Sequence, residues 1–390
     1  MIMKKGMHVL FLYLLLIVSF AITGVQTSEA ISTEPVPQVL KPLWSATYLQ
    51  GIDAIAVSPD AGFVGVVTST QISLLDINGK EIWSIAPEQI SPYLRPTALA
   101  IGPGGRWVII AGDPSYRYIW RVNRDGSRWF FKTVGTPRTI AVTRSGDLIA
   151  VGTAGGHLYL LDQHGHTIRD ISLDFDLIEN LKFSDDDKYI VICSAWINGV
   201  LSRSGKFRWR SKIGWYEIHP SRNLKYFGAL SRTAHGPPAS GVAMLDEKGK
   251  ELWSRALWSG DIRIAPSGEY AVISGIPIAQ DTQIWDPQTW PQELDSASVS
   301  IIDQKGTTVR ERSLPSHGLG FITSDSRTIA LFFSGRIMGF NLHLEPVWII
   351  EPPGSFIYLP PSLLFTYTYN NSHHRLSAFR LPTEPACNRK

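Results

Sequence analysis

The 390-residue chain contains very little cysteine, which limits how it can be stabilised. Only Cys193 and Cys387 are present. Cys193 lies in an apolar, strand-like stretch and Cys387 among the last four residues, so we expect no bridge between them. Two cysteines also exclude a disulfide framework. Stability must therefore come from buried apolar area, for which thirteen Trp, sixteen Phe and thirteen Tyr supply the material.

The chain also lacks a large excess of charge of one sign. Lys and Arg number 37 and Asp and Glu 34, a net charge of +3. Removal of residues 1–30 would leave a net charge of +2. Phosphate binding needs clustered Lys and Arg, so we expect no nucleic-acid partner.

No apolar run is long enough for an ordinary membrane-spanning helix. The run from Met7 to Ile22 has 16 residues, short of the ~20 that a spanning helix needs. Lys4 and Lys5 precede it, and small residues at Ser28 and Ala30 follow. This pattern predicts a signal peptide over residues 1–30, cut after Ala30. The protein is expected to be secreted or to lie in the cell envelope, and an uncleaved N-terminal anchor is the alternative.

A repeated phrase is the main positive feature. It consists of LLDINGKEIWS at Leu74–Ser84 and MLDEKGKELWS at Met244–Ser254, with looser copies elsewhere. Successive turn positions are 47, 39, 40, 44, 57 and 38 residues apart. A period of roughly 40–45 residues built of short strands is typical of a β-propeller. The turn positions are Gly79, Gly126, Gly165, Gly205, Gly249, Gly306 and, in place of a seventh glycine, Leu344.

A second phrase, an apolar strand followed by a turn rich in Pro, Asp, Ser and Gly, occurs eight times and predicts eight hairpins. Only seven turns of the first phrase follow them. The segment Pro42–Tyr48 resembles the strands that follow those turns, so we expect it to complete the last blade and remove a free sheet edge. The prediction is an all-β, eight-bladed propeller of four-stranded antiparallel blades over residues 42–382, with seven blades as the alternative. Residues 31–41 form a linker and residues 383–390 a tail.

Aromatic residues recur at one position of the strand after each turn. We expect them to fill the gaps between blades, near a Gly that permits close approach, and not to form a ligand cage. They are Trp44, Trp83, Trp209, Trp253 and Trp348, with Phe130 in the second blade.

The phrase LxDxxGKExW resembles the tryptophan-docking repeat of PQQ-like propellers, the quinoprotein alcohol dehydrogenase-like superfamily. The hairpin phrase resembles WD40-type repeats. The quinoprotein alcohol dehydrogenase-like superfamily includes an outer-membrane assembly lipoprotein that acts as a scaffold. Its quinoprotein enzymes use adjacent cysteines, calcium and a catalytic Asp. This chain has no adjacent cysteines, so the resemblance implies a non-catalytic member without a cofactor, although PQQ or Ca²⁺ stays open.

The predicted fold divides the loops between two faces. If the strands of a blade are named a to d from the inside outwards, the a–b and c–d turns lie on one face, and the b–c loops and d–a connections lie on the other, the loop face. Length variation is concentrated on the loop face, at 86–96, 112–118, 231–240 and 274–297, and such loops are the usual place for recognition. The residues expected to bind a ligand there are Tyr93, Arg95, Tyr116, Arg117, Trp196, Arg232, His235, Trp258, Trp285, Trp290 and His317.

No catalytic or metal-binding motif is visible. The chain has no GxSxG elbow, HExxH helix or phosphate-binding Gly loop. His164 and His166 flank a tight turn, which favours solvent exposure over metal binding. Asp53 and Asp261 fall near the starts of inner strands, where propeller enzymes often place acids around the channel. Two such positions among eight inner strands are not enough to predict an active site.

These observations favour an exported, non-enzymatic scaffold that binds a protein or a cell-surface polysaccharide through the loop face. The alternative is an exported PQQ-type dehydrogenase, or a hydrolase with its site at the channel mouth. In either case we expect contact with the membrane only through an uncleaved N-terminal anchor.

Overall fold

The computed structural model describes most of the chain after residue 36. The described residues are 37–92, 94–96, 98–112, 117–173, 177–194, 198–211, 217–232, 240–277, 297–316, 318–323, 325–333, 336–351, 355–359, 363–370 and 373–382. The predicted signal peptide and the predicted tail lie outside them. None of the described helices is long and apolar enough to cross a membrane.

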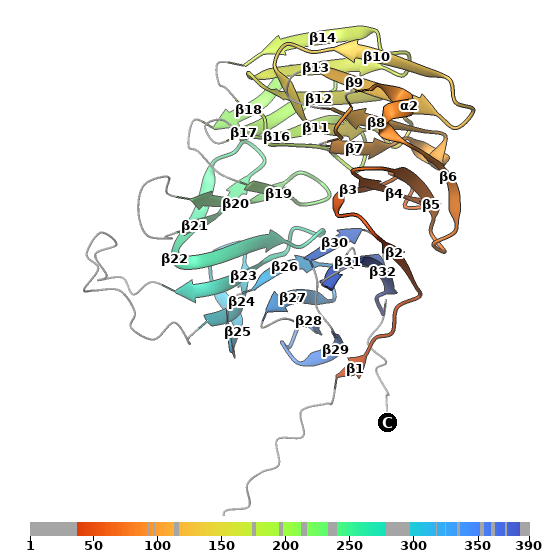
Figure 1. Cartoon of the computed structure of the whole chain (residues 1–390). Coiled ribbons are helices and arrows are strands. Elements are labelled where there is room, and N and C mark those ends of the chain that lie inside the picture. Colours follow the sequence, from red (N-terminus) through yellow and green to blue (C-terminus); the bar gives the residue numbers. More distant parts are fainter. Residues whose placement is uncertain are drawn as a thin grey trace, which may run out of the picture. The chain divides into compact units, whose positions relative to one another are not determined.

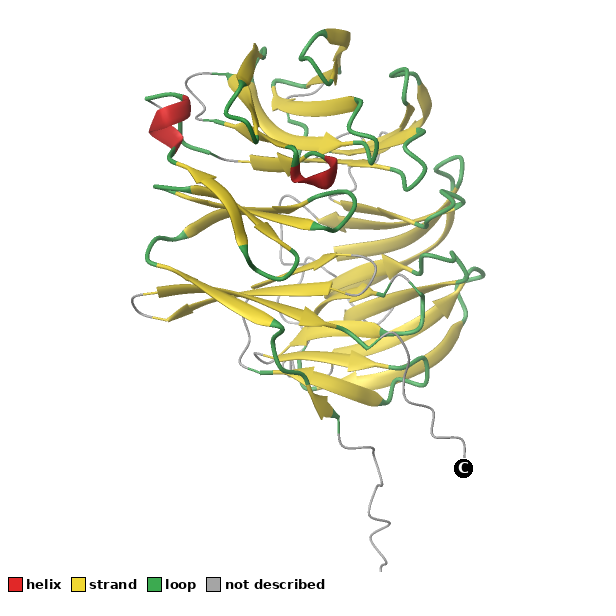
Figure 2. Ribbon diagram, turned by 90° about the vertical axis from the view of Figure 1, so that its right-hand side faces the viewer, coloured by secondary structure: helices red, strands yellow, loops and turns green. Residues whose placement is uncertain are grey.

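The described chain folds as an eight-bladed β-propeller of four-stranded antiparallel blades, as predicted. Figures 1 and 2 show the strands, with a short helix α2 (Pro87–Ile90) and a 3-10 turn (Pro103–Gly105) between them. Blade 1 consists of β3 (Ile52–Val57), β4 (Phe63–Thr68), β5 (Ile72–Asp76) and β6 (Glu81–Ile85), and blade 2 of β7 (Ala98–Ile101), β8 (Trp107–Ala111), β9 (Tyr118–Asn123) and β10 (Arg128–Lys132). Blade 3 consists of β11 (Thr136–Val142), β12 (Leu148–Ala154), β13 (His157–Asp162) and β14 (Thr167–Ser172). Blade 4 consists of β15 (Asn180–Phe183), β16 (Tyr189–Cys193), β17 (Asn198–Ser202) and β18 (Phe207–Ser211).

Blades 5 and 6 share one long strand, β22 (Glu251–Ile264), and so form a single seven-stranded sheet. The first half of β22 pairs with β21 and the second half with β23. The other strands of this sheet are β19 (Glu217–Pro220), β20 (Tyr226–Arg232), β21 (Ser240–Asp246), β23 (Tyr270–Pro277), β24 (Ala297–Asp303) and β25 (Thr308–Leu314).

The ring is closed by the N-terminal segment, as the sequence predicted. β2 (Trp44–Tyr48) pairs with β32 and becomes the outer strand of blade 8, so a strand near the beginning of the described chain lies beside the last strand (Figure 1). A shorter strand, β1 (Gln38–Val39), lies within the segment expected to be a linker and pairs in parallel with β29. The remaining strands of blades 7 and 8 are β26 (Leu319–Ile322), β27 (Ile329–Phe333), β28 (Arg336–Phe340), β29 (Pro346–Ile350), β30 (Ser355–Leu359), β31 (Leu363–Asn370) and β32 (His373–Arg380).

The repeated Asp and Gly build the turn between strands c and d. In blade 1, Asp76 Oδ1 accepts hydrogen bonds from the backbone N–H groups of Asn78 and Lys80 at 2.8 and 2.9 Å. Gly79 then adopts a φ of 82°, a left-handed conformation that glycine takes without a steric cost. The phrase therefore encodes a self-capped turn, which explains its regularity without any ligand.

The repeated Trp side chains pack between blades, as predicted. A Cβ added to Gly79 would lie 2.5 Å from the ring of Trp44, and one added to Gly249 would lie 2.5 Å from Trp209. Each of these rings therefore covers the turn glycine of the following blade. The close approach is possible only because glycine has no side chain.

Blade 2 departs from the predicted pattern, and the placement of Phe130 was wrong. Phe130 is 59 % exposed, whereas the neighbouring Trp129 packs against Gly165 of blade 3. The cause is the strand register. β5 and β6 are separated by a bulge after the turn, but β9 and β10 pair without one. Loss of one residue from the register moves each side chain to the opposite face of the sheet.

Cys193 is buried in β16 and unpaired. Burial raises the pKa of its thiol to about 12, so the side chain is an inert apolar group at neutral pH. Cys387 lies outside the described residues, so the expected absence of a bridge stays a prediction.

Candidate functional site

The inner strands of blades 1 to 3 differ sharply from those of blades 4 to 6. The residues compared are those two and four positions before the first residue of each a–b turn. In blades 1 to 3 they are small: Ala54, Ala56, Ala98, Ala100, Thr139 and Ala141. In blades 4 to 6 they are polar or charged: Asn180, Lys182, Glu217, His219, Asp261 and Arg263. One sector of the central channel is therefore polar.

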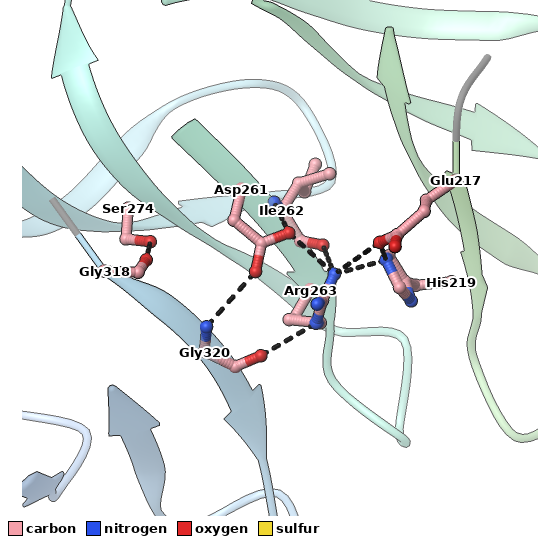
Figure 3. Close-up of polar contacts among 8 residues, drawn as sticks. All are labelled: Glu217, His219, Asp261, Ile262, Arg263, Ser274, Gly318 and Gly320. Carbon is pink, nitrogen blue, oxygen red and sulfur yellow. Dashed lines mark hydrogen bonds and ion pairs between the residues drawn. The ribbon is translucent and has the colours of Figure 1, made fainter. Parts of the chain in front are cut away.

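Arg263 lies at the centre of this polar sector (Figure 3). Its Nη1 is 2.6 Å from Asp261 Oδ1 and 3.5 Å from Glu217 Oε2, and it also contacts His219 Nε2. Glu217 Oε2 is in turn 2.9 Å from His219 Nε2. Side chains from β19 and β22 thus meet around one guanidinium group. We call Glu217, His219, Asp261 and Arg263 the axial cluster.

Both carboxylate oxygens of Asp261 accept hydrogen bonds from other groups of the protein. The side chain is only 2 % exposed. Its Oδ1 accepts from the backbone N–H of Ile262 at 2.9 Å in addition to Arg263, and its Oδ2 accepts from the N–H of Gly320 at 3.2 Å. Arg263 Nε donates to the carbonyl of Gly320 at 2.8 Å. Asp261 and Arg263 together hold the backbone of β26, so the axial cluster joins blades 5, 6 and 7 (Figure 3).

The donor atoms of Glu217, His219 and Asp261 lie within 4.8 Å of one another, which is a spacing suited to a metal ion. Arg263 contacts all three of these side chains. A metal ion would therefore have to displace a guanidinium that is also bonded to Gly320. The geometry favours an ion-pair network centred on the guanidinium of Arg263.

The imidazole of His219 is surrounded by protein although it borders the channel. Burial lowers its pKa, and the positive charge of Arg263 lowers it further, while Glu217 and Asp261 act in the opposite direction with smaller effect. His219 is therefore neutral in the folded protein at neutral pH.

This depressed pKa predicts a loss of stability in acid. The unfolded chain binds a proton at His219 near pH 6.5, whereas the folded chain does not, so the stabilisation is present above that pH and is lost as the pH falls below it. The free energy of unfolding should fall by at most about 1.4 kcal/mol per pH unit from this group. Urea unfolding between pH 7.5 and 5 measures it. His219→Gln should flatten the profile, whereas His343→Gln, in an exposed turn, should not.

A cavity of about 350 Å³ lies beside the axial cluster, lined by residues of blades 4 to 7. Lys182 borders this cavity and a second one next to it. Its side chain is exposed to solvent by surface area, but protein surrounds it, as expected for a group inside a channel. That confinement lowers the pKa of Lys182. Arg222 and Asp185, which also line the cavity, pair with each other at 3.0 Å.

The structure places the two acids singled out from the sequence in different surroundings. Asp261 belongs to the axial cluster, whereas Asp53 is exposed on β3 and lines a smaller cavity with residues of blade 8. The sequence analysis missed Glu217, His219 and Arg263. The signal that could have found them was the comparison of equivalent inner-strand positions, where small residues in three blades are followed by polar or charged residues in the next three.

The residues predicted on the loop face are mostly outside the described part of the chain. Arg95 and Arg117 are described and exposed. Arg232 lies in β20 and Trp258 within β22, in the middle of a strand where a connection was expected. Those outside the described residues are Tyr93, Tyr116, Trp196, His235, Trp285, Trp290 and His317. The loop-face site therefore stays a prediction.

The turn histidines are where the sequence placed them. His166 is 80 % exposed and its Nδ1 lies 3.0 Å from Asp162 Oδ2. His164 is exposed in the same turn. These contacts belong to the turn itself.

No protein-family model matches the sequence, and no curated protein matches it. Among solved structures the chain is similar to BamB from Moraxella catarrhalis, with 13 % identity over 88 % of this chain and 100 % of that chain and a TM-score of 0.59. The propeller of Dos1 has 14 % identity over 88 % of this chain and 97 % of that chain, with a TM-score of 0.60. The C-terminal WD40 domain of Sif2 has 12 % identity over 89 % and 99 %, with a TM-score of 0.59. What they share is the propeller fold. Fold alone does not carry function.

Proposed function

We propose that this protein is an exported, non-catalytic propeller that binds a protein or a cell-surface polymer through its loop face. The observation that carries the proposal is that the polar groups of the axial cluster bond to one another and to the backbone. Its acidic and basic groups resemble an active site in composition, but Arg263 and backbone N–H groups occupy Asp261, and Arg263 also contacts Glu217 and His219. A general base or metal site needs a free lone pair directed at a substrate or ion.

Export and a cell-envelope location are part of the proposal, because they rest on the predicted signal peptide. The absence of a bound cofactor is also part of it. The similar structures support the fold on which the proposal is built. Exposed Arg95 and Arg117 support the use of the loop face, since Arg is enriched at protein interfaces.

Capture of a partner tests the binding function. The mature chain, immobilised, should retain a specific component of the envelope fraction of the producing organism. Tyr116→Ala and Trp285→Ala should each reduce this capture at least about fivefold, because aromatic anchors dominate binding energy. Leu252→Ala serves as a matched control, since Leu252 is an exposed apolar residue on β22. Unchanged capture by both loop variants, at unchanged melting temperature, would contradict the loop-face assignment.

Titration with PQQ and Ca²⁺ tests the alternative of a dehydrogenase. We expect no spectral change of PQQ on addition of the mature chain and no dye-linked oxidation of alcohols or sugars. Saturable PQQ binding with turnover would overturn the non-catalytic proposal. A parallel titration of Glu217→Gln would then show whether the axial cluster takes part.

A further inference from the structure

The small net charge of the chain conceals a concentration of positive charge in one place. Residues 95–138 contain seven Arg and one Lys against two Asp. This stretch carries +6, and the other 346 residues together carry −3. It spans blade 2 with the connections on both sides of it, and its last three residues begin β11 of blade 3. The charge is therefore strongly localised along the chain, and clustered Lys and Arg create a local field even on a nearly neutral protein.

These cations are not neutralised within the described part of the molecule. None of the eight forms an ion pair there, whereas Arg203 pairs with Asp147 and Arg208 with Glu247 on later blades. Arg117, Arg128 and Lys132 are exposed. Positive charge at these positions is available to a partner.

Three aromatic side chains lie next to these exposed cations. Tyr118 and Trp120 on β9 face the same way as Phe130 on the adjacent β10, with ring centroids 5.5 and 5.1 Å from that of Phe130. Lys132 is opposite Tyr118 in the strand pair, and its Nζ lies 6.0 Å from the centroid of that ring. We call this group the blade 2 surface. It consists of Arg117, Tyr118, Trp120, Arg128, Phe130 and Lys132.

The blade 2 surface results from the missing bulge between β9 and β10. In blade 1 the equivalent residue, Trp83, packs against the apolar cluster between blades 1 and 2, but in blade 2 the register without a bulge leaves Phe130 exposed. Phe130 therefore contributes little to the core, and beside it Arg128 donates a hydrogen bond to the Gln89 carbonyl but forms no ion pair within the described residues. Exposed aromatic and Arg side chains are the types that supply most of the binding energy at protein interfaces.

We infer that the blade 2 surface binds an acidic polypeptide segment that also carries apolar or aromatic side chains. Two of the three cations of the blade 2 surface, Arg117 and Arg128, are Arg, whose planar guanidinium binds carboxylates with two parallel hydrogen bonds. β10 is the outer strand of its sheet, so its main-chain groups border the same surface, and an extended peptide can pair with such an edge. The chain itself adds β1 to the outer strand of blade 7 in this way.

The ring arrangement favours a polypeptide over a nucleic acid or polysaccharide. Stacking of bases needs aromatic faces that are free and flat. Here the ring of Tyr118 meets that of Phe130 at 82°, and the ring of Trp120 meets it at 46°. The rings therefore pack on one another and present a joint apolar surface, which suits side chains of a peptide. The inference rests on the proposed function as a binding scaffold.

Binding of defined polyanions tests the inference on the intact mature chain. The probes are a random copolymer of Glu and Tyr, poly-L-glutamate, polygalacturonate and duplex DNA, compared at equal charge concentration by fluorescence anisotropy. We expect the Glu–Tyr copolymer to bind most tightly and to weaken as salt rises from 50 to 300 mM. The triple variant Arg117→Gln, Arg128→Gln, Lys132→Gln should bind it on the order of tenfold more weakly. Phe130→Ala should remove the advantage of the Glu–Tyr copolymer over poly-L-glutamate.

The matched control removes three positive charges from exposed turns of other blades, as Lys80→Gln, Lys248→Gln, Lys305→Gln. It should bind within about twofold of the parent. Equal weakening by both triple variants would mean that only net charge matters and would overturn the inference. Preference for polygalacturonate or DNA would assign the surface to those polymers and overturn it as well. If the copolymer does not bind while Tyr116→Ala and Trp285→Ala still reduce capture, this inference fails and the proposed function stands. Failure of this inference is therefore distinct from failure of the proposed function.

Discussion

Replacement of Trp44 by alanine is expected to lower the free energy of unfolding by about 3 kcal/mol or more. Trp44 belongs to β2, the strand that closes the ring, and its side chain packs against Gly79 of blade 1. Its Nε1 also donates to the carbonyl of Ile77 at 2.8 Å. Truncation of a packed Trp costs about 3–5 kcal/mol, and loss of the hydrogen bond leaves the Ile77 carbonyl to find water. Urea unfolding followed by Trp fluorescence and by far-ultraviolet circular dichroism measures the change.

Phe130→Ala is the control for this prediction. The sequence pattern assigns Phe130 the same position as Trp44, but the structure leaves it 59 % exposed. Its truncation should change the free energy of unfolding by less than about 1 kcal/mol. Equal costs for the two substitutions would contradict the register that places Trp129, and not Phe130, between blades 2 and 3.

Asp261→Ala is expected to cost about 3–5 kcal/mol, since removal of one partner from a buried ion pair leaves the other uncompensated. The substitution takes the carboxylate from Arg263 and from the N–H of Gly320 at once. Of the hydrogen bonds described above between β22 and β26, only the one from Arg263 to the Gly320 carbonyl would then remain. The melting temperature and the urea midpoint should both fall.

The comparison variant is Asp185→Ala, which also removes an Asp that pairs with arginines. Asp185 is 39 % exposed and pairs with Arg144 at 3.4 Å and Arg222 at 3.0 Å. Exposed pairs contribute about 0–1 kcal/mol, so this variant should stay close to the parent. If Asp261→Ala proved neutral or stabilising, the axial cluster would be kept for something other than stability, and an enzymatic role at the channel would regain its basis.

The propeller, its eight blades and its closure by Pro42–Tyr48 could be predicted because each depends on local patterns. An Asp that caps its own turn, a Gly with positive φ and a Trp at a fixed distance recur along the chain, and they need no knowledge of distant contacts. The parallel pairing of β1 with β29 could not be predicted in this way, because two residues carry no periodic signal. The wrong prediction for Phe130 had a similar origin, since a bulge is a property of two paired strands and cannot be recognised from the sequence of one of them.

The candidate site was harder to predict than the fold. Asp261 was noticed for its place near the start of an inner strand. Its partners Glu217, His219 and Arg263 belong to strands whose side chains meet only in the assembled ring. The local concentration of Arg in blade 2 was present in the sequence, but the net charge of +3 concealed it. Charge counted in windows the length of one blade would have found it.

The continuous strand β22 has a consequence for how the ring unfolds. Repeat proteins generally behave as a chain of units in which each repeat couples to its neighbours through an interface. Between blades 5 and 6 that interface is supplemented by one unbroken backbone ladder of seven strands. These two repeats should therefore exchange their amide hydrogens as one cooperative unit, slower than any other adjacent pair and open only when the ring itself opens. The axial cluster lies on this double repeat, and so should remain intact until the ring itself opens.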